Sequence, residues 1–494
     1  NDTFALWYAQ EIEEYRTDVK TINTSLLATD WYIDQMKRKT YESDPIPSQM
    51  SHDLYAYGIR DYIKHEALID SVRWDIKDFM NWVSSDNPKT KYRNLIQQSG
   101  GDPNQYPLNT QEMVFYPTNK LRFYVNKENV IKSGIINPSE IDKIVDYIDI
   151  DIPKSGLYKN QILMLDILSK NDWERPIYFT GGSYKDSEYI WMKDYLQLDG
   201  LVYKLVPIKT PINEENPYQM GRIEPNRMYD IVKKWEWGNS ESPEIYHDPE
   251  TRKNSISFRG NLHRLAEEFI KAGDYEKAAE MIELNFEKMP LDYFEYYSLS
   301  EPYISSYYKI GEAEKAQKLF KKLEKKYLDQ IRYYSISMRD YDDIFPLSNF
   351  AENIFTYTER YRGLIENEIL LGNYIFAAES IEKFINYTET FKSIYGEYDY
   401  YIFLINFIEP LYISSKLDEG RKLYKSISSE INSRLNTLIS AKEDSNSTYL
   451  SELFDDEVSS AKSLLNIIKD YEKDEFYDSE VEGLNDIIEN FISK

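Results

Sequence analysis

Cysteine is absent from the 494-residue sequence. The chain therefore forms no disulfide, offers no thiolate to zinc or to an iron–sulfur cluster, and has no thiol nucleophile. Long apolar runs are missing as well. The most apolar stretch, YYIFLINFIEPLYI, is interrupted by Asn406, Glu409 and Pro410, and it falls short of the ~20 apolar residues that a membrane-spanning helix needs. The sequence by itself predicts a soluble chain.

The signatures of several enzyme classes are also missing. The sequence has no GxxxxGK[ST] phosphate loop, no GxGxxG dinucleotide fingerprint, no GxSxG nucleophile elbow and no HExxH zinc motif. Its histidines lack the spacing of metal ligands, which favours packed or surface positions for His52, His65, His247 and His263. Nucleophilic and metal-dependent hydrolysis have no support, and we expect no cofactor.

Acidic side chains outnumber basic ones, 85 to 59, which gives a net charge of -26. A chain this acidic is repelled by phosphate backbones, so nucleic acid is excluded as a partner. The hydrophobic fraction of 41% is enough for packed cores. Because a domain usually has ~100–200 residues, the length predicts two or more units.

Strand-like and helix-like segments alternate up to residue 237. Residues 18–23, 121–125, 176–180 and 201–207 have the composition of strands. Helical spacing of apolar residues predicts helices at 3–14, 30–39, 69–83, 160–169 and 187–196. The first of these is expected to pack through Phe4, Leu6, Trp7, Ile12 and Tyr15. This alternation is typical of an α/β domain, with a mixed sheet and flanking helices, at 1–237.

A different pattern follows a linker rich in Pro, Ser, Asn and charge at residues 238–256. The stretch GNLHRLAEEFIKAGDYEKAAEMIELNFEKMP resembles a tetratricopeptide repeat, with two apolar helix faces joined at Gly273. Its turn-and-helix half recurs at Gly311, at Gly372 and, degraded, at Ser415, at unequal intervals. Residues 257–494 are therefore expected to form an irregular all-α tetratricopeptide-like solenoid.

Polar loops beside predicted strands and helices are the candidate binding sites. Loops at the carboxyl ends of strands form the ligand crevice of many α/β folds, and helix N-termini there attract anions. For any single loop, ordinary caps and turns are the favoured explanation. The candidate residues are Asn1, Asp2, Thr3, Asp30, Trp31, Thr180, Gly181, Gly182 and Ser183.

A weaker candidate for a metal site is the Asp-x-Asp spacing of Asp149 and Asp151 in DYIDIDIP. Two carboxylates on one strand face can chelate a divalent cation. Strict alternation with Ile148, Ile150 and Ile152 is also what any half-exposed strand shows, and this interpretation is favoured.

Three stretches resemble blocks of a known family, in the same order. They are NDTFALWYAQEIEEYRTDVKTINTSLLATDWYIDQMKRK at the start, LMLDILSKNDWERPIYFTGG at 163–182 and YLQLDGLVYKLVPIK at 195–209. The family consists of bacterial multi-span membrane proteins related to the eukaryotic transmembrane O-mannosyltransferase of the GT-C glycosyltransferase class. The block WERPIYF is the most specific part, and the helical tail after Phe258 agrees. Ala5 stands where family members have proline, and their preceding strand and Asn-Gly-Asp loop are missing here.

The resemblance implies the extracytoplasmic C-terminal region of such a protein, at the periplasmic face of the inner membrane. The family's membrane helices would pass a sugar from a polyprenyl-phosphate donor to a Ser or Thr hydroxyl, and they hold the catalytic carboxylate. This chain, attached to the membrane through its missing N-terminal region, would bind an acceptor protein or an envelope-complex subunit through its helical repeats.

Two other functions remain open at this point. A freestanding glycan-binding protein of the cell envelope would use some of the 45 tyrosines for stacking on sugars. A scaffold protein of the envelope would use the solenoid alone. A soluble sugar-nucleotide transferase that relies on Asp149 and Asp151 is the weakest alternative.

Overall fold

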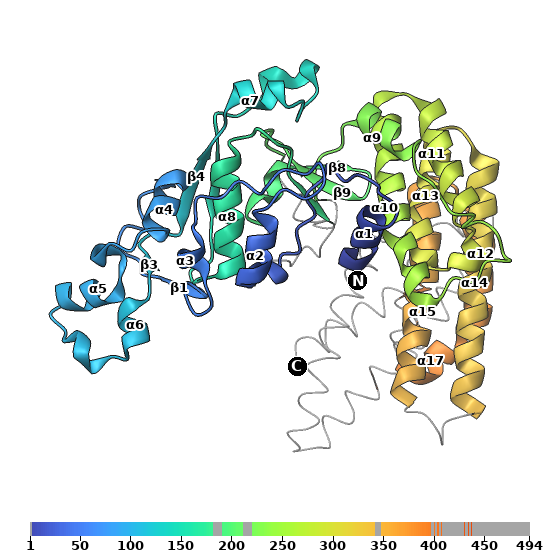
Figure 1. Ribbon diagram of the computed structural model, residues 1–494. Coiled ribbons are helices and arrows are strands. Elements are labelled where there is room, and N and C mark those ends of the chain that lie inside the picture. Colours follow the sequence, from blue (N-terminus) through green and yellow to red (C-terminus); the bar gives the residue numbers. More distant parts are fainter. Residues whose placement is uncertain are drawn as a thin grey trace. The chain divides into compact units, whose positions relative to one another are not determined.

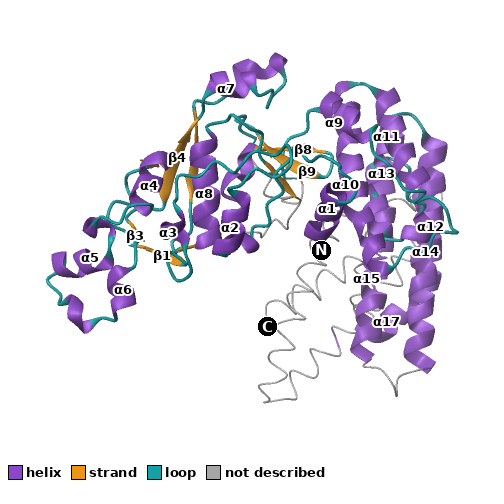
Figure 2. Ribbon diagram, viewed as in Figure 1, coloured by secondary structure: helices purple, strands orange, loops and turns teal. Residues whose placement is uncertain are grey.

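The computed structural model divides the chain into two compact units, residues 1–236 and 237–494 (Figure 1). It describes residues 2–180, 190–210, 220–340 and 347–396, together with the single residues Tyr400, Phe403, Leu404, Phe407, Ser429, Ser433 and Asn436. The first unit has mixed sheets with flanking helices, and the second is helix-rich (Figure 2). The expected order of an α/β unit followed by a helical, solenoid-like region is confirmed. Over the described ranges, no helix has the length and apolarity to cross a membrane.

Among the described residues, the first unit contains three small three-stranded sheets. In chain order its strands are β1 (Tyr62–His65), β2 (Trp74–Asp75), β3 (Phe115–Tyr116), β4 (Lys120–Tyr124), β5 (Tyr147–Asp151), β6 (Leu157–Tyr158), β7 (Tyr178–Thr180), β8 (Leu196–Asp199) and β9 (Val202–Leu205). The strand orders are β3-β1-β6, β2-β4-β5 and β7-β9-β8. Parallel pairing of β1 with β3 and of β2 with β4 makes the first two sheets mixed, whereas the third is antiparallel.

Helices flank these sheets and share the core with the strands and the connecting segments. They are α1 (Asp2–Glu11), α2 (Asp30–Met36), α3 (His52–Tyr55), α4 (Ile76–Val83), α5 (Tyr92–Gln98), α6 (Leu108–Glu112), α7 (Lys127–Lys132), α8 (Lys159–Asn171) and α9 (Pro225–Val232). Alternation along β4 buries Leu121 and Phe123, and α4 and α8 pack on each other nearby. The period-2 and period-3.6 apolar patterns therefore meet in one continuous core.

The WERPIYF block forms a sharp corner between α8 and β7. Asp172 and Trp173 both have positive φ, 42° and 64°, a backbone region that is costly for residues other than glycine. The corner is held because the Asn126 amide donates to the Asp172 carboxylate at 2.7 Å and the Asn129 amide donates to the Asp172 carbonyl at 2.8 Å. Trp173 is buried and stacks on Phe123 with ring centroids 5.1 Å apart. This corner sets where the third sheet starts.

The described part of the second unit consists of helices that pack on their neighbours along the chain. Its helices are α10 (Pro249–Ala272), α11 (Tyr275–Lys288), α12 (Leu291–Phe294), α13 (Pro302–Lys309), α14 (Ala313–Asp340), α15 (Leu347–Leu370), α16 (Tyr374–Tyr387) and α17 (Glu389–Tyr395). Gly273 ends α10 in the left-handed conformation, φ 77°, and Asp274 caps α11 directly after it. Helical turns also occur at Gly311 and Gly372, as the repeat pattern predicts. The fourth predicted turn, at Ser415, lies outside the described residues.

Three predictions about local structure in the first unit are wrong. Residues 18–23 form no strand, because side chains hold this segment instead; the Gln10 amide, for example, donates to the Val19 carbonyl at 2.8 Å. The helix expected at 69–83 begins only at Ile76, where the Asp75 carboxylate accepts from the Lys77 amide at 2.8 Å. Within the expected helix 187–196, the described residues 190–195 are a 3₁₀ turn and Leu196 already belongs to β8.

Two further expectations are corrected. The apolar face of α1 is largely open to solvent: Phe4 is 70% exposed and Ile12 64%, while Trp7 is the one of the five named side chains that packs on the described core. The expected linker 238–256 is helical from Pro249 onward, because Asp248 accepts from the Glu250 and Thr251 amides and a proline at the first helical position suits a helix start.

Candidate functional site

A buried group of charges lies on the third sheet of the first unit. The carboxylate of Asp199, at the end of β8, is 3% exposed. It lies 3.2 Å from the Lys204 ammonium of β9 and accepts at 2.8 Å from the Arg227 guanidinium of α9. The Gln197 amide donates to its other oxygen at 2.8 Å. One carboxylate thus holds two cations, and it ties α9 to the sheet.

Burial sets the protonation behaviour of these groups. Burial lowers the pKa of Lys204, although the Asp199 carboxylate opposes this effect. Nearby, the carboxylate of Glu140 accepts a bidentate pair of hydrogen bonds from Arg222 and a bond from Lys143. Burial raises the pKa of Glu140, but these bonds outweigh it and the net shift is downward. Arg222 and Lys143 therefore favour the charged form of the Glu140 carboxylate.

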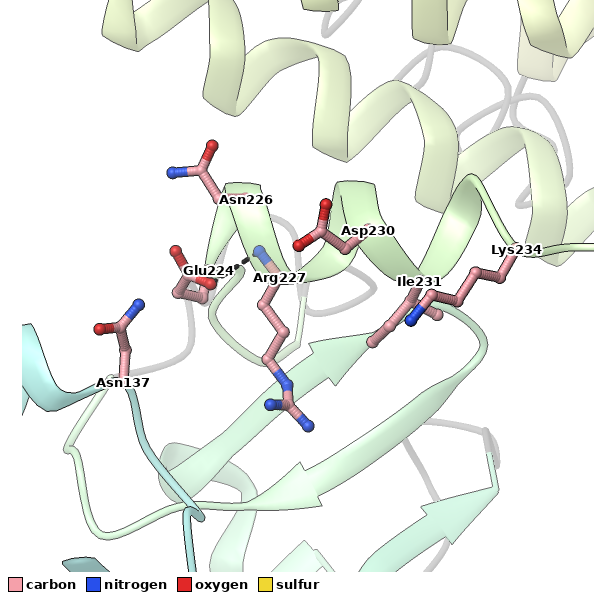
Figure 3. A pocket seen from close by; sticks show the side chains of 7 residues that line it. All are labelled: Asn137, Glu224, Asn226, Arg227, Asp230, Ile231 and Lys234. Carbon is pink, nitrogen blue, oxygen red and sulfur yellow. Dashed lines mark hydrogen bonds between the residues drawn. The ribbon is translucent and has the colours of Figure 1, made fainter. Parts of the chain in front are cut away.

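A surface pocket of about 420 Å³ opens beside α9 (Figure 3). It is lined by Asn137, Glu224, Asn226, Arg227, Asp230, Ile231 and Lys234. The Arg227 side chain extends from α9 toward the strands, where it meets Asp199. Gly200, at φ 72° in the β8–β9 turn, allows close packing, since a Cβ there would lie 3.1 Å from Ile231 and from Trp235. Helix α9, which supplies most of the residues that line the pocket, is therefore fixed to the sheet.

Two of the predicted loops are linked by a single asparagine. The Asn23 amide side chain donates to the Thr3 hydroxyl at 2.8 Å, and its backbone amide donates to the Tyr32 hydroxyl, also at 2.8 Å. Tyr32 lies in the first turn of α2, which begins at Asp30. Trp31 is 54% exposed there and meets Tyr32 edge-on. The structure thus connects Thr3 with the Asp30–Trp31 helix start.

The remaining loop residues lie elsewhere or cannot be placed. Thr180 ends β7, where it pairs with Val202 in the third sheet, and no hydrogen bond joins it to Thr3 or Asp30 among the described residues. Asp2 is the first residue of α1. Asn1, Gly181, Gly182 and Ser183 lie outside the described residues, so convergence of the three loops stays a prediction.

Next to Asp30, helices α2 and α3 form a small titratable cluster. The His52 imidazole Nδ1 lies 3.0 Å from the Asp34 carboxylate, which also accepts from the Tyr55 hydroxyl at 2.8 Å. The hydrogen bond to Asp34 raises the pKa of His52, and the same bond lowers the pKa of Asp34. Both groups are accessible to solvent, so ligands could reach them.

The pair predicts a measurable pH dependence. Because the His52 pKa is raised in the folded state, its contribution to stability is fully present below the unfolded value of ~6.5 and is lost as pH rises through the folded pKa. Titration of the imidazole followed by NMR should give a pKa above that of a free histidine. Asp34→Asn should return the His52 pKa to the ordinary range. Asp78→Asn, which removes an exposed carboxylate of α4, is the control and should leave the His52 pKa unchanged. An ordinary pKa in the unmodified chain would contradict the pairing.

The Asp-x-Asp segment lies on β5, as the favoured interpretation predicts, but both carboxylates have arginine partners. Arg122 donates to Asp149 from two nitrogens, at 2.8 and 3.0 Å, and Arg73 donates to Asp151 at 2.8 Å. Arg73 also lies 3.4 Å from Asp149. These guanidinium groups occupy both carboxylate oxygens of Asp149 and one of Asp151, and their positive charges repel a cation. In the described part of the chain, no group of three or more His, Asp or Glu side chains is arranged to hold a metal.

The arginine partners predict that manganese will leave the chain's melting temperature unchanged. A bound ion would stabilise the folded state by mass action, and a carboxylate site would lose that gain in Asp149→Ala. We expect thermal unfolding curves with and without millimolar manganese to coincide for both proteins. If manganese raised the melting temperature of the unmodified chain but not that of Asp149→Ala, the result would support a metal site at Asp149.

A serine, a histidine and a glutamate meet in the second unit, but not as a catalytic triad. The Ser306 hydroxyl lies 3.2 Å from the His263 Nε2 and donates to the Glu267 carboxylate at 2.6 Å. In a triad the carboxylate would bind the opposite ring nitrogen and the histidine would take the serine proton. Here Glu267 lies 3.8 Å from the same Nε2, and burial lowers the pKa of His263. The group is a packing network between α10 and α13.

Sequence reasoning missed the Asp199 network, the pocket beside α9 and the buried carboxylate of Asp166. The Asp166 carboxylate accepts from the Ser48 hydroxyl at 2.5 Å and from the Gln49 amide at 3.1 Å, and burial raises its pKa. An aspartate in the otherwise apolar helix pattern LMLDILS was the available signal. No comparable signal marked Asp199, because its partners come from β9 and α9.

The comparison with known families concerns the first unit. Residues 1–227 match the family model of TMEM260-associated domain 2. The first unit is similar to that domain. The matched residues include all three of the sheets described above and the start of α9. No curated protein and no solved structure matches the chain.

Proposed function

We propose that this chain is the acceptor- or partner-binding region of a protein O-glycosyltransferase that uses a polyprenyl-phosphate sugar, as O-mannosyltransferases do. The observation that carries the proposal is the match of residues 1–227 to TMEM260-associated domain 2. In this proposal the parent protein is a bacterial membrane enzyme of the GT-C class. The chain lies at the periplasmic face of the inner membrane and does not perform the transfer itself.

The pairing of the charged side chains supports binding rather than catalysis. Asp149 and Asp199 each hold arginine partners, and the Ser306 hydroxyl is bonded to Glu267. A general base needs a free lone pair within reach of the substrate proton. In these groups the hydrogen bonds go to other side chains of the fold, which favours a structural role over proton transfer.

The second unit supplies the surface that we assign to the partner. Leu370 and Ile375 lie on either side of the α15–α16 turn and are 86% and 71% exposed. Large apolar side chains exposed this far are common at protein-binding sites, and stacked helix pairs typically present them on extended surfaces. A polypeptide acceptor that offers apolar side chains near its Ser or Thr residues fits such a surface.

Cross-linking from one position tests the proposal. A photoreactive phenylalanine analogue in place of Leu370, in the full-length parent protein in its own cells, should cross-link to a protein that carries an O-linked sugar on Ser or Thr. The same analogue at Lys318, an exposed polar position of α14, is the matched control and should not. Partners without O-linked sugar, or equal cross-linking from both positions, would contradict acceptor binding.

A further inference from the structure

The pocket beside α9 is built from charges that balance. Glu224 and Asp230 are acidic, and Arg227 and Lys234 are basic. Two amides, Asn137 and Asn226, and one aliphatic side chain complete the lining. A volume of about 420 Å³ falls within the ~300–1,000 Å³ range of small-molecule sites.

Part of this lining is already fixed by the fold. The Glu224 carboxylate caps α9 by accepting from the Arg227 backbone amide at 2.8 Å (Figure 3). The Arg227 guanidinium donates to the Asp199 carboxylate at 2.8 Å and to the Tyr178 hydroxyl at 3.3 Å. These hydrogen bonds hold the two side chains in place without a ligand, which lowers the entropy cost of binding.

Other lining groups remain available. Asp230 and Lys234 are exposed and make no ion pair with any described residue. The Asn137 oxygen accepts from Ser139 at 3.1 Å, and its amide nitrogen donates to no group within the described ranges. The pocket therefore offers a carboxylate acceptor, an ammonium donor and an amide donor at one place.

We propose that this pocket binds a saccharide unit without net charge. A sugar carries hydroxyl groups that both donate and accept, so it can satisfy carboxylate, ammonium and amide groups together. An anionic ligand would face the carboxylates of Glu224 and Asp230, and a metal ion would face Arg227 and Lys234. An extended peptide would need a groove or a free strand edge rather than a compact pocket.

This inference stands on the pocket alone and goes beyond the proposed function. It gives the first unit a ligand of its own, whereas the acceptor-binding proposal rests on the family match and concerns the second unit.

Titration of the purified chain with neutral methyl glycosides of mannose, glucose, galactose and N-acetylglucosamine tests the inference. We expect saturable binding of at least one glycoside by ligand-detected NMR. Asp230→Asn and Lys234→Met should each weaken it about tenfold, the typical effect of one lost charged hydrogen bond. Asp78→Asn, an exposed carboxylate on the eight-residue helix α4, should bind as the unmodified chain does.

Three results would overturn the inference. They are a flat titration against all four glycosides, glycoside binding that Asp230→Asn and Lys234→Met leave intact, and saturable binding of inorganic phosphate or magnesium in place of the sugars. Both substitutions lie on exposed positions, and unchanged thermal unfolding curves will confirm that the variants fold. Any of these failures would leave the cross-linking prediction for the second unit unaffected.

Discussion

Asp199→Ala is expected to destabilise the first unit by about 3–5 kcal/mol, the cost of removing one partner from a buried ion pair. The carboxylate is the common partner of Lys204 and Arg227, and the Lys204 side chain is only 1% exposed. Without Asp199 the ammonium stays buried with no counter-charge, so the folded state must deprotonate it or open. Urea denaturation followed by tryptophan fluorescence measures the change in free energy of unfolding.

A second substitution separates lost charge pairing from lost packing. Lys204→Met in the Asp199→Ala background removes the uncompensated ammonium and should recover a large part of the lost stability. Asp18→Ala breaks the exposed pair with Arg16 and should leave the free energy of unfolding almost unchanged, because solvent screens this pair. If Asp199→Ala were as mild as Asp18→Ala, the network would not stabilise the third sheet.

Arg259→Ala is expected to destabilise the second unit by a similar amount, about 3–5 kcal/mol. Arg259 of α10 is fully buried, and its guanidinium donates to the Ser300 hydroxyl at 2.7 Å and to the Met289 carbonyl at 2.8 Å. Burial lowers its pKa to about 10. Truncation would leave a large cavity and an unsatisfied carbonyl where α10 meets the chain after α11. Circular dichroism at 222 nm during thermal unfolding reports on this helical unit.

Arg259→Met is the matched variant, because it fills most of the cavity without a charge. Since burial of the charge already works against the arginine, we expect the methionine variant to lose much less stability than the alanine variant. Equal losses in the two variants would show that the hydrogen bonds to Ser300 and Met289, rather than the packing, carry the effect. No loss in Arg259→Ala would contradict the structural role altogether.

Regular apolar spacing allowed the helices of the second unit to be predicted well. Gly273, Gly311 and Gly372 mark turns because positive φ favours glycine, and buried Ala278 lies where two helices approach closely. Strand β5 was equally clear, since period-2 alternation is strict around Ile148 and Ile150. Local patterns of this kind need no knowledge of distant partners.

Features that depend on distant partners were not predictable. Arg222 meets Glu140 across 82 residues, and Arg227 meets Asp199 across 28. A single sequence does not show which distant residues come together in the fold. Neither the Asp199 network nor the α9 pocket could therefore be predicted. The Asp-x-Asp spacing shows the same limit, because Arg73 and Arg122 determine its chemistry from other segments. A related limit applies to α1. Its apolar spacing correctly predicts a helix, but it does not show whether another element packs on the apolar face.

Sugar transfer by the isolated chain is the most direct test of the claim that this region binds rather than catalyses. Purified chain, a polyprenyl-phosphate-linked radiolabelled mannose and an acceptor protein rich in Ser and Thr would be incubated together, with the full-length parent protein in membranes assayed in parallel. We expect no transfer by the chain above a blank without protein, and transfer by the parent. Transfer by the isolated chain would contradict the proposed division of roles.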